Sequence, residues 1–160
     1  MQAIPDHFPV SVIMESRPSN SVWQDESWDA VGVCSVSGDS LDSDHQSSEK
    51  VIKLGDVEQV IYSDLKLRLF LDECESYYHN LMSPKPGCFV IARENDNGRP
   101  VPFLVSMSFD EAHAYQEGDD LVYAVPIPPE LYRWLEAYVI EHYAPVKRKK
   151  RKRKNWKAGE

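Results

Sequence analysis

CFVIARENDNGRPVPFLVSM, residues 88–107, is the stretch that decides the fold. The apolar run 88–93 is bounded by turn residues, which is typical of a buried strand. Residues 95–98 read Asn-Asp-Asn-Gly, a sequence that favours a reverse turn, and residues 101–107 form a second apolar run. The stretch therefore predicts an antiparallel hairpin.

A helical pattern precedes this hairpin. Asp72 is its predicted N-cap, because Glu73 and Glu75 would then lie in the first turn, where carboxylates suit the helix dipole. Apolar residues continue at helical spacing to Leu81. The sequence SPKPG at 83–87 predicts that the helix ends there.

A helix, a strand and another helix are predicted after the hairpin. Ser108 and Glu111 form a capping-box pattern that opens a short helix ending near Gly118. Residues 121–126 are typical of a strand. The last helix begins at residues 128–130 (PPE), because proline is tolerated in a first helical turn. Its expected buried stripe consists of Leu131, Trp134, Leu135, Tyr138, Val139 and His142.

The N-terminal half alternates apolar and polar residues, which predicts strands. The first two, at 8–15 and 28–36, would form a hairpin with Trp23 and Trp28 near its bend. Two apolar stretches follow at 51–54 and 57–62, and the alternation of Leu65, Leu67 and Leu69 predicts a further strand. Together the elements predict an α+β fold in a single domain over residues 1–145. Its sheet is mainly antiparallel and hairpin-rich, with two or three helices covering one face.

Two segments are too polar to build a core. Residues 37–49, SGDSLDSDHQSSE, are expected to form a mobile acidic loop. Residues 146–160, the basic tail, contain nine Lys/Arg and one acid, giving a local charge of +8. Cations this close repel one another, so the tail is predicted to be disordered.

The tail is also the predicted partner-binding site, because its charge opposes that of the remaining chain. The whole chain has 18 Lys/Arg and 26 Asp/Glu, which leaves 9 and 25 in residues 1–145, a charge of −16. A concentrated positive charge attracts a polyanion, an anionic membrane surface or an acidic protein. The predicted site residues are Lys147, Arg148, Lys149, Lys150, Arg151, Lys152, Arg153, Lys154 and Trp156.

No motif predicts catalysis, a metal site or a cofactor. Glycine-rich phosphate loops are absent, and seven glycines are scattered through the chain. Cys74 and His79 are five residues apart, which suits joint metal ligation on a helix poorly. No GxSxG sequence occurs, and the five histidines form no recognisable catalytic pattern. We therefore expect no catalytic residues and no cofactor.

The expected location is the cytoplasm. The N-terminus lacks a basic leader and an apolar core, and no apolar stretch is long enough to span a membrane. Three cysteines, at 34, 74 and 88, are far apart and outside any CxxC, which is typical of reduced thiols.

Three segments carry a resemblance to a known family: residues 12–33, residues 75–93, and residues 124–154 with the basic run. They resemble an uncharacterised family of small bacterial cytoplasmic proteins, a domain of unknown function. Members are often encoded beside formate dehydrogenase genes, and some are labelled molybdopterin-guanine dinucleotide biosynthesis protein A. The label implies a glycine-rich nucleotide loop, which residues 8–18 lack.

The resemblance implies a non-catalytic accessory protein for assembly, maturation or regulation of a molybdenum- or tungsten-dependent formate dehydrogenase. Its partners would be the dehydrogenase or its maturation factors, with the tail contacting an acidic surface or the anionic pterin dinucleotide. An alternative is nucleic-acid binding, in which the tail contacts phosphates without reading sequence. A third possibility is that the tail folds back on the acidic part of the chain.

Overall fold

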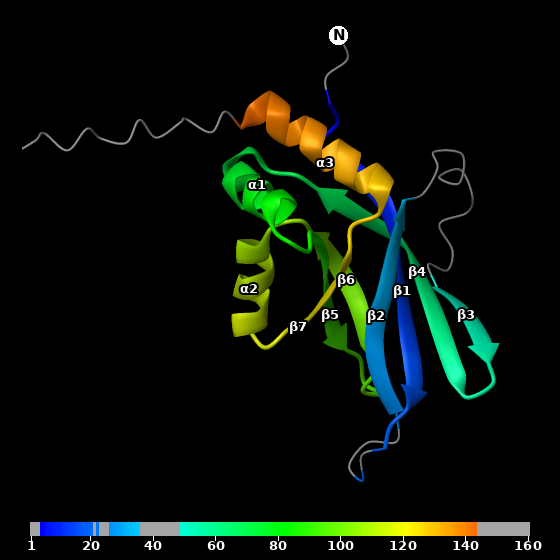
Figure 1. Ribbon diagram of the computed structural model, residues 1–160. Coiled ribbons are helices and arrows are strands. Elements are labelled where there is room, and N and C mark those ends of the chain that lie inside the picture. Colours follow the sequence, from blue (N-terminus) through cyan, green and yellow to red (C-terminus); the bar gives the residue numbers. More distant parts are fainter. Residues whose placement is uncertain (1–3, 21, 23–25, 36–48, 144–160) are drawn as a thin grey trace, which may run out of the picture.

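The structure, a computed structural model, describes residues 4–20, 22, 26–35 and 49–143 (Figure 1). Seven strands form one sheet that curls into a nearly closed barrel. Helices α1 and α2 lie along one side of the sheet, and α3 lies across one end of the strands (Figure 1). This arrangement confirms the predicted α+β fold with a mainly antiparallel sheet and three helices.

The strands are β1 (His7–Pro18), β2 (Glu26–Ser35), β3 (Glu49–Leu54), β4 (Val57–Arg68), β5 (Gly87–Glu94), β6 (Pro100–Ser106) and β7 (Leu121–Pro126). The helices are the 3₁₀ turn η2 (Leu71–Glu73), α1 (Cys74–Met82), α2 (Phe109–Glu117) and α3 (Pro129–His142). Their order along the chain agrees with the predicted order.

The sheet has the strand order β2-β1-β4-β6-β5-β7, and β3 pairs with β4. Neighbouring strands are antiparallel except β4 and β6, which meet in parallel at Leu67 and Val105. The two end strands of this order, β2 and β7, approach each other and bring the sheet close to closure.

Bulges provide the curvature. The β1–β4 register shifts between Val10 and Val12, and the β4 residue opposite this shift, Asp64, has a positive φ of 65°. Extra residues of this type bend a strand and increase its twist. The apolar stretch 57–62 and the strand predicted from Leu65 to Leu69 are therefore parts of one bent strand, which ends at Arg68.

The predicted hairpin is confirmed as β5 and β6. Its turn is held by Asn95, whose side-chain oxygen accepts hydrogen bonds from the backbone N–H groups of Asn97 and Arg99, both at 3.0 Å. Gly98 takes the positive φ that the turn requires, 78°. Ile91 and Val90 of β5 are fully buried, so this hairpin forms the centre of the packed structure.

Helix α3 closes the barrel end with most of its predicted stripe. Leu131 and Leu135 are fully buried, and Trp134 packs on Phe8 of β1 with ring centroids 5.3 Å apart. The Trp134 indole N–H also donates to the Pro5 carbonyl at 2.7 Å. His142 was predicted to continue this stripe, but it is exposed because it lies in the last turn, beyond the barrel.

The predicted N-cap at Asp72 is wrong. Asp72 lies inside η2, and α1 begins at Cys74. The reason is a side-chain contact: the Tyr77 hydroxyl accepts a hydrogen bond from the Phe70 N–H at 3.0 Å. This bond fixes the chain just before η2, the turn that precedes α1. Glu73, at the cap position, accepts instead from the Ser108 hydroxyl of the α2 cap at 2.7 Å.

Other predictions fall partly or wholly outside the described residues. The expected loop 37–49 ends one residue too late, because Glu49 already pairs with Tyr62 in the sheet. Residues 37–48 and the basic tail lie outside the described ranges. The boundary predicted at 145 and the hairpin residue Trp23 also lie outside them.

Candidate functional site

The predicted partner-binding residues, Lys147–Lys154 and Trp156, lie outside the described residues. Lys147 is four residues beyond Tyr143, which is the last residue of the described range 49–143. The end of α3 is therefore the described surface closest to the tail along the chain.

An apolar groove, which we call the α1–α3 groove, begins at this end of α3. It has a volume of about 450 Å³ and runs between the two helices. Its walls combine three tyrosines with aliphatic side chains and one carboxylate. They are Tyr78, Leu81, Met82, Tyr132, Glu136, Val139, Ile140 and Tyr143.

The helical period explains why the groove forms. On α3, the groove residues Tyr132, Glu136 and Ile140 are spaced four apart, beside the buried stripe and not within it. On α1, Tyr78 and Met82 are also four apart and form the facing ridge. The two ridges face each other across a hollow because the buried stripes of both helices are turned toward the core.

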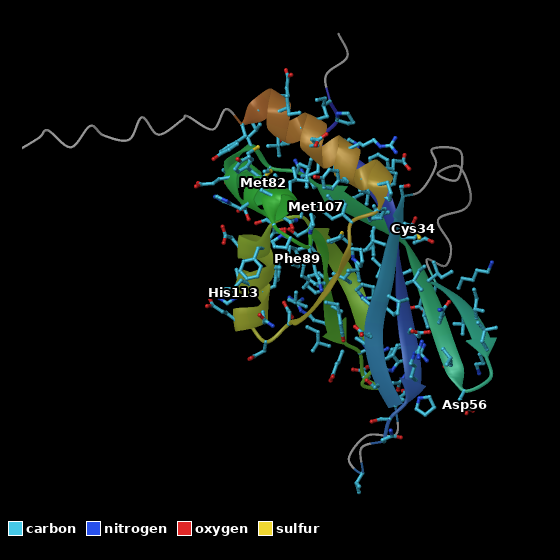
Figure 2. All side chains as sticks on the ribbon, in the orientation of Figure 1. Cys34, Asp56, Met82, Phe89, Met107 and His113 are labelled. Atoms are coloured by element: carbon cyan, nitrogen blue, oxygen red, sulfur yellow. The ribbon has the colours of Figure 1, made fainter. Side chains whose placement is uncertain are left out.

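The groove exposes large apolar side chains. Met82, which lies on α1 under α3, is 67% exposed, and Ile140 is 75% exposed (Figure 2). Covering a side chain of this size is worth about 1.5–3 kcal/mol. Tyr78 and Tyr143 close one end of the groove, with ring centroids 5.3 Å apart. The arrangement suits an apolar occupant lying along the helices.

Two more hollows extend this surface around the Ser83–Gly87 turn. One, of about 530 Å³, shares Tyr132 with the α1–α3 groove and continues beneath the end of β7. The other, of about 430 Å³, shares Lys85 with it and reaches Phe89 and Phe109 beside α2. Neighbouring hollows therefore have one wall residue in common, Tyr132 or Lys85.

Asn80 holds the turn between the hollows. Its side-chain amide donates to the carbonyls of Gly87 at 2.7 Å and Met107 at 2.9 Å, and its oxygen accepts from the Gly87 N–H at 2.9 Å. Asn80 is 8% exposed, so these bonds satisfy backbone groups that water reaches poorly. In the sequence, Asn80 was noted only within the segment 75–93 that carries the family resemblance. Its role was not predicted because its hydrogen-bond partners are distant in sequence or lie in a turn.

The α1–α3 groove was also not predicted from the sequence. The available signal was Ile140, an apolar residue outside the predicted buried stripe of α3. Met82 gave a similar signal, because it is the last apolar residue before the Ser83–Gly87 turn. Which neighbours these residues face depends on how α1 crosses α3, and no local pattern encodes that crossing.

Buried ionisable groups next to this region are held in their neutral forms. Burial raises the pKa of the Cys88 thiol to about 12, and it also raises the pKa of Tyr77. The pKa of Cys74 is also raised, by burial and by the nearby Asp72 carboxylate. A thiol with a raised pKa has little thiolate and is a weak nucleophile or metal ligand. Within the described ranges, no three His, Cys, Asp or Glu side chains form a group suited to a metal ion.

A smaller polar hollow lies at the opposite end of the barrel. It has a volume of about 220 Å³ and lies beside Trp28, whose indole N–H donates to Glu26 at 3.1 Å. The Arg99 guanidinium lies 5.1 Å from the Trp28 ring centroid and forms an ion pair with Glu58 at 3.3 Å. Trp28, predicted to lie near the hairpin bend, is partly buried and packs against the hydrophobic core.

Residues 9–154 match the family described as "Protein of unknown function (DUF3305)". The chain belongs to this family. The match begins within β1, includes the other strands, the helices and the cationic run, and ends before Trp156. No curated protein and no solved structure matches the chain. In the part of the chain that the structure describes, no helix combines the length and apolar content needed to cross a membrane.

Proposed function

We propose that this chain is a non-catalytic accessory protein that docks a client protein through the α1–α3 groove. The groove carries the proposal, because it exposes Met82 and Ile140 between two helices that are otherwise fixed to the barrel. Exposed apolar residues gathered in a recess are typical of protein interaction sites. The basic tail, attached directly after the groove, adds a second point of attachment.

The proposed client is a molybdenum- or tungsten-dependent formate dehydrogenase, or one of its maturation factors. This part of the proposal depends on the sequence resemblance, which links the family to formate dehydrogenase genes. Assembly, maturation and regulation all require a reversible contact with the enzyme. A recessed apolar groove with a charged extension suits such a contact, because the charge raises the association rate while the groove gives specificity.

Co-purification with quantitative mass spectrometry tests the client. The bait is the tagged full-length chain, expressed in its natural host in place of the untagged protein. The matched variants are Ile140→Glu in the groove and Leu54→Glu, an apolar residue 63% exposed on β3. Leu54 adjoins the turn that contains Asp56, far from Met82 in Figure 2. We expect dehydrogenase subunits or their maturation factors with wild type and Leu54→Glu, and loss of them with Ile140→Glu.

A deletion strain provides the second readout. Formate dehydrogenase activity should fall when the gene is removed and return when it is supplied again. If the bait repeatedly retains no dehydrogenase component, and the deletion strain has normal enzyme activity, the proposed client is wrong. Equal retention of dehydrogenase components by Ile140→Glu and Leu54→Glu would show that the contact lies outside the groove.

The alternative function is nucleic-acid association through the tail, favoured by eight consecutive cations at 147–154. Phosphate contacts of this kind weaken steeply as salt increases and do not distinguish sequences. The charge of −16 on residues 1–145 opposes the approach of a polyanion. A gel-shift experiment at low salt tests this function: no retardation of RNA or DNA would exclude it.

A further inference from the structure

We propose that β3 joins two copies of this chain, each β3 pairing antiparallel with the other about a two-fold axis at Val51. This inference goes beyond the proposed function and uses a different part of the molecule. Figure 1 shows β3 at the outer margin of the sheet, on the side away from the described helices. Asp56, in the turn after β3, lies far from Met82 of the α1–α3 groove in Figure 2, so the pairing leaves the groove open.

One edge of β3 has no strand beside it. Within the described residues, β3 pairs only with β4. Five of its six residues are exposed, including Val51 at 47%, whereas Val60, which lies opposite Val51 in β4, has no exposed area. A strand edge of this kind presents backbone N–H and C=O groups that are free to pair with another strand.

The turn after β3 determines which backbone groups point outward. Gly55 and Asp56 form a two-residue turn, in which Gly55 takes a positive φ of 61°. The flanking residues, Leu54 and Val57, are therefore a hydrogen-bonded pair, and bonding alternates along an antiparallel ladder. The backbone groups of Leu54, and of every second residue before it, bond to β4. Those of residues 49, 51 and 53 point to the free edge.

These outward groups match those of a second copy. A two-fold axis at Val51 places Val51 opposite Val51 of the second copy, and Glu49 opposite Lys53. All of the outward groups then meet, so each opposed pair exchanges two N–H···O=C hydrogen bonds. The pairing extends the sheet of one copy into the sheet of the other.

Charge selects this register. Glu49 of each copy lies opposite Lys53 of the other, and neither side chain forms an ion pair within the described residues. Opposite charges on directly opposed residues stabilise a strand pair, and like charges destabilise it. An axis at Lys50 would oppose two lysines, and an axis at Ile52 would leave Lys53 opposite Val51. Lysine on an edge strand usually prevents pairing, but here a carboxylate faces it.

A second copy fits this edge better than an unrelated strand. The pattern of Glu49, Val51 and Lys53 is its own complement about a two-fold axis, as a symmetric dimer requires. An unrelated strand would need the matching charges in its own sequence. Five paired residues from each copy form a small interface, in the class below about 1,200 Å² that is typical of transient association. We therefore expect a weak dimer that forms as concentration increases.

Sedimentation equilibrium of the full-length protein, from about 5 to 500 µM, measures the self-association. We expect the average mass to rise from that of one chain toward that of two. Val51→Pro removes the central outward N–H, and an edge strand tolerates proline at a position whose N–H faces away from the sheet. This variant should raise the dissociation constant about tenfold or more. Val51→Thr, which keeps the N–H and the β-branched shape, should change it by no more than about twofold.

Charge exchange tests the register. Glu49→Lys and Lys53→Glu each place like charges opposite each other in both charged pairs, so each variant alone should dimerise about tenfold more weakly. A mixture of the two variants restores both opposite-charge pairs, and its association should return to within about threefold of wild type. Ile140→Glu, in the α1–α3 groove, should leave the dimer unchanged.

Several results would overturn the inference. They are the mass of one chain at every concentration, equal association by wild type and Val51→Pro with intact folds, and a mixture that associates no better than either charge variant alone. Self-association that Ile140→Glu abolishes would place the second copy at the groove and would also overturn it. Unfolding curves verify each fold. If Val51→Pro unfolds, the charge exchange decides, because its variants alter only exposed side chains.

The absence of a dimer would leave the proposed function intact, because no residue of β3 lines the α1–α3 groove. Leu54, the control position in the co-purification experiment, lies one residue outside the paired stretch, and its backbone groups bond to β4. A dimer of this kind presents two α1–α3 grooves.

Discussion

The two faces of α3 place similar apolar side chains in opposite environments, one buried and one exposed. On one face Leu131 and Leu135 are fully buried against the barrel end. On the adjacent face Tyr132 and Ile140 line the α1–α3 groove, and Ile140 is 75% exposed. The first face stabilises the fold, and the second leaves apolar area available to a partner. Substitutions on the two faces should therefore separate stability from binding.

The largest expected effect is on the buried face. Leu135→Ala removes a side chain with no exposed area and leaves a cavity, so we expect a loss of about 2–5 kcal/mol in the free energy of unfolding. Urea denaturation followed by circular dichroism measures it. A loss below about 0.5 kcal/mol would mean that α3 contributes little to the fold and would contradict the comparison.

Asn80→Ala should have the second-largest effect on stability. It tests the hydrogen bonds that hold the turn next to the α1–α3 groove. The change leaves two carbonyls and one N–H without their partner, and we expect a loss of about 2–4 kcal/mol in the free energy of unfolding. The matched control is Asn97→Ala in the exposed β5–β6 turn, with an expected effect within about 0.5 kcal/mol. Equal losses in the two variants would show that the Asn80 contacts are not stabilising.

The buried thiol predicts a pH dependence. Cys88 has a pKa raised by burial to about 12 in the folded protein, against an ordinary value of 9.0. As pH rises above 9.0, the unfolded chain loses this proton first, so the free energy of unfolding falls. The decline is at most ~1.4 kcal/mol per pH unit for one group, and it ends near the folded pKa.

Cys88→Ala should flatten the decline in stability with pH, measured by urea denaturation at a series of pH values above neutral. The flattening is partial, because the pKa of Tyr77 is also raised by burial and contributes in the same direction. Cys34→Ala, which removes an exposed thiol, is the matched variant. Equal flattening in both variants would contradict the assignment to burial.

The smallest expected effect on stability is on the groove face. Ile140→Glu replaces a side chain that contacts solvent, so the free energy of unfolding should change by no more than about 0.5 kcal/mol. The same denaturation measurement checks this. A loss as large as that of Leu135→Ala would show that Ile140 belongs to the core and would remove the basis for a docking groove.

The sequence predicted the elements well because their signals are local. The strand at 121–126 agrees residue for residue with β7, and the Ser108 cap is confirmed by the 3.1 Å bond that its hydroxyl accepts from the Glu111 N–H. Alternation, turn residues and caps act over a few neighbouring residues, so they can be recognised without a structure.

The features that were missed depend on residues distant in sequence. The meeting of Leu67 with Val105, which places β4 beside β6, follows from packing and not from either segment alone. Glu73, at the cap position of α1, accepts a hydrogen bond from Ser108 at the start of another helix, a partner that no local pattern indicates. The α1–α3 groove was missed for the same reason, since its two walls meet only through the crossing of two helices.

The measurement that most directly tests the account is the co-purification of dehydrogenase components with Ile140→Glu and Leu54→Glu, each compared with wild type. Both substitutions place a carboxylate on an exposed apolar position, so they differ chiefly in location. We expect Ile140→Glu to lose the client while keeping wild-type stability, and Leu54→Glu to retain the client. Equal retention by both variants, with intact folds, would contradict the claim that the α1–α3 groove docks the client.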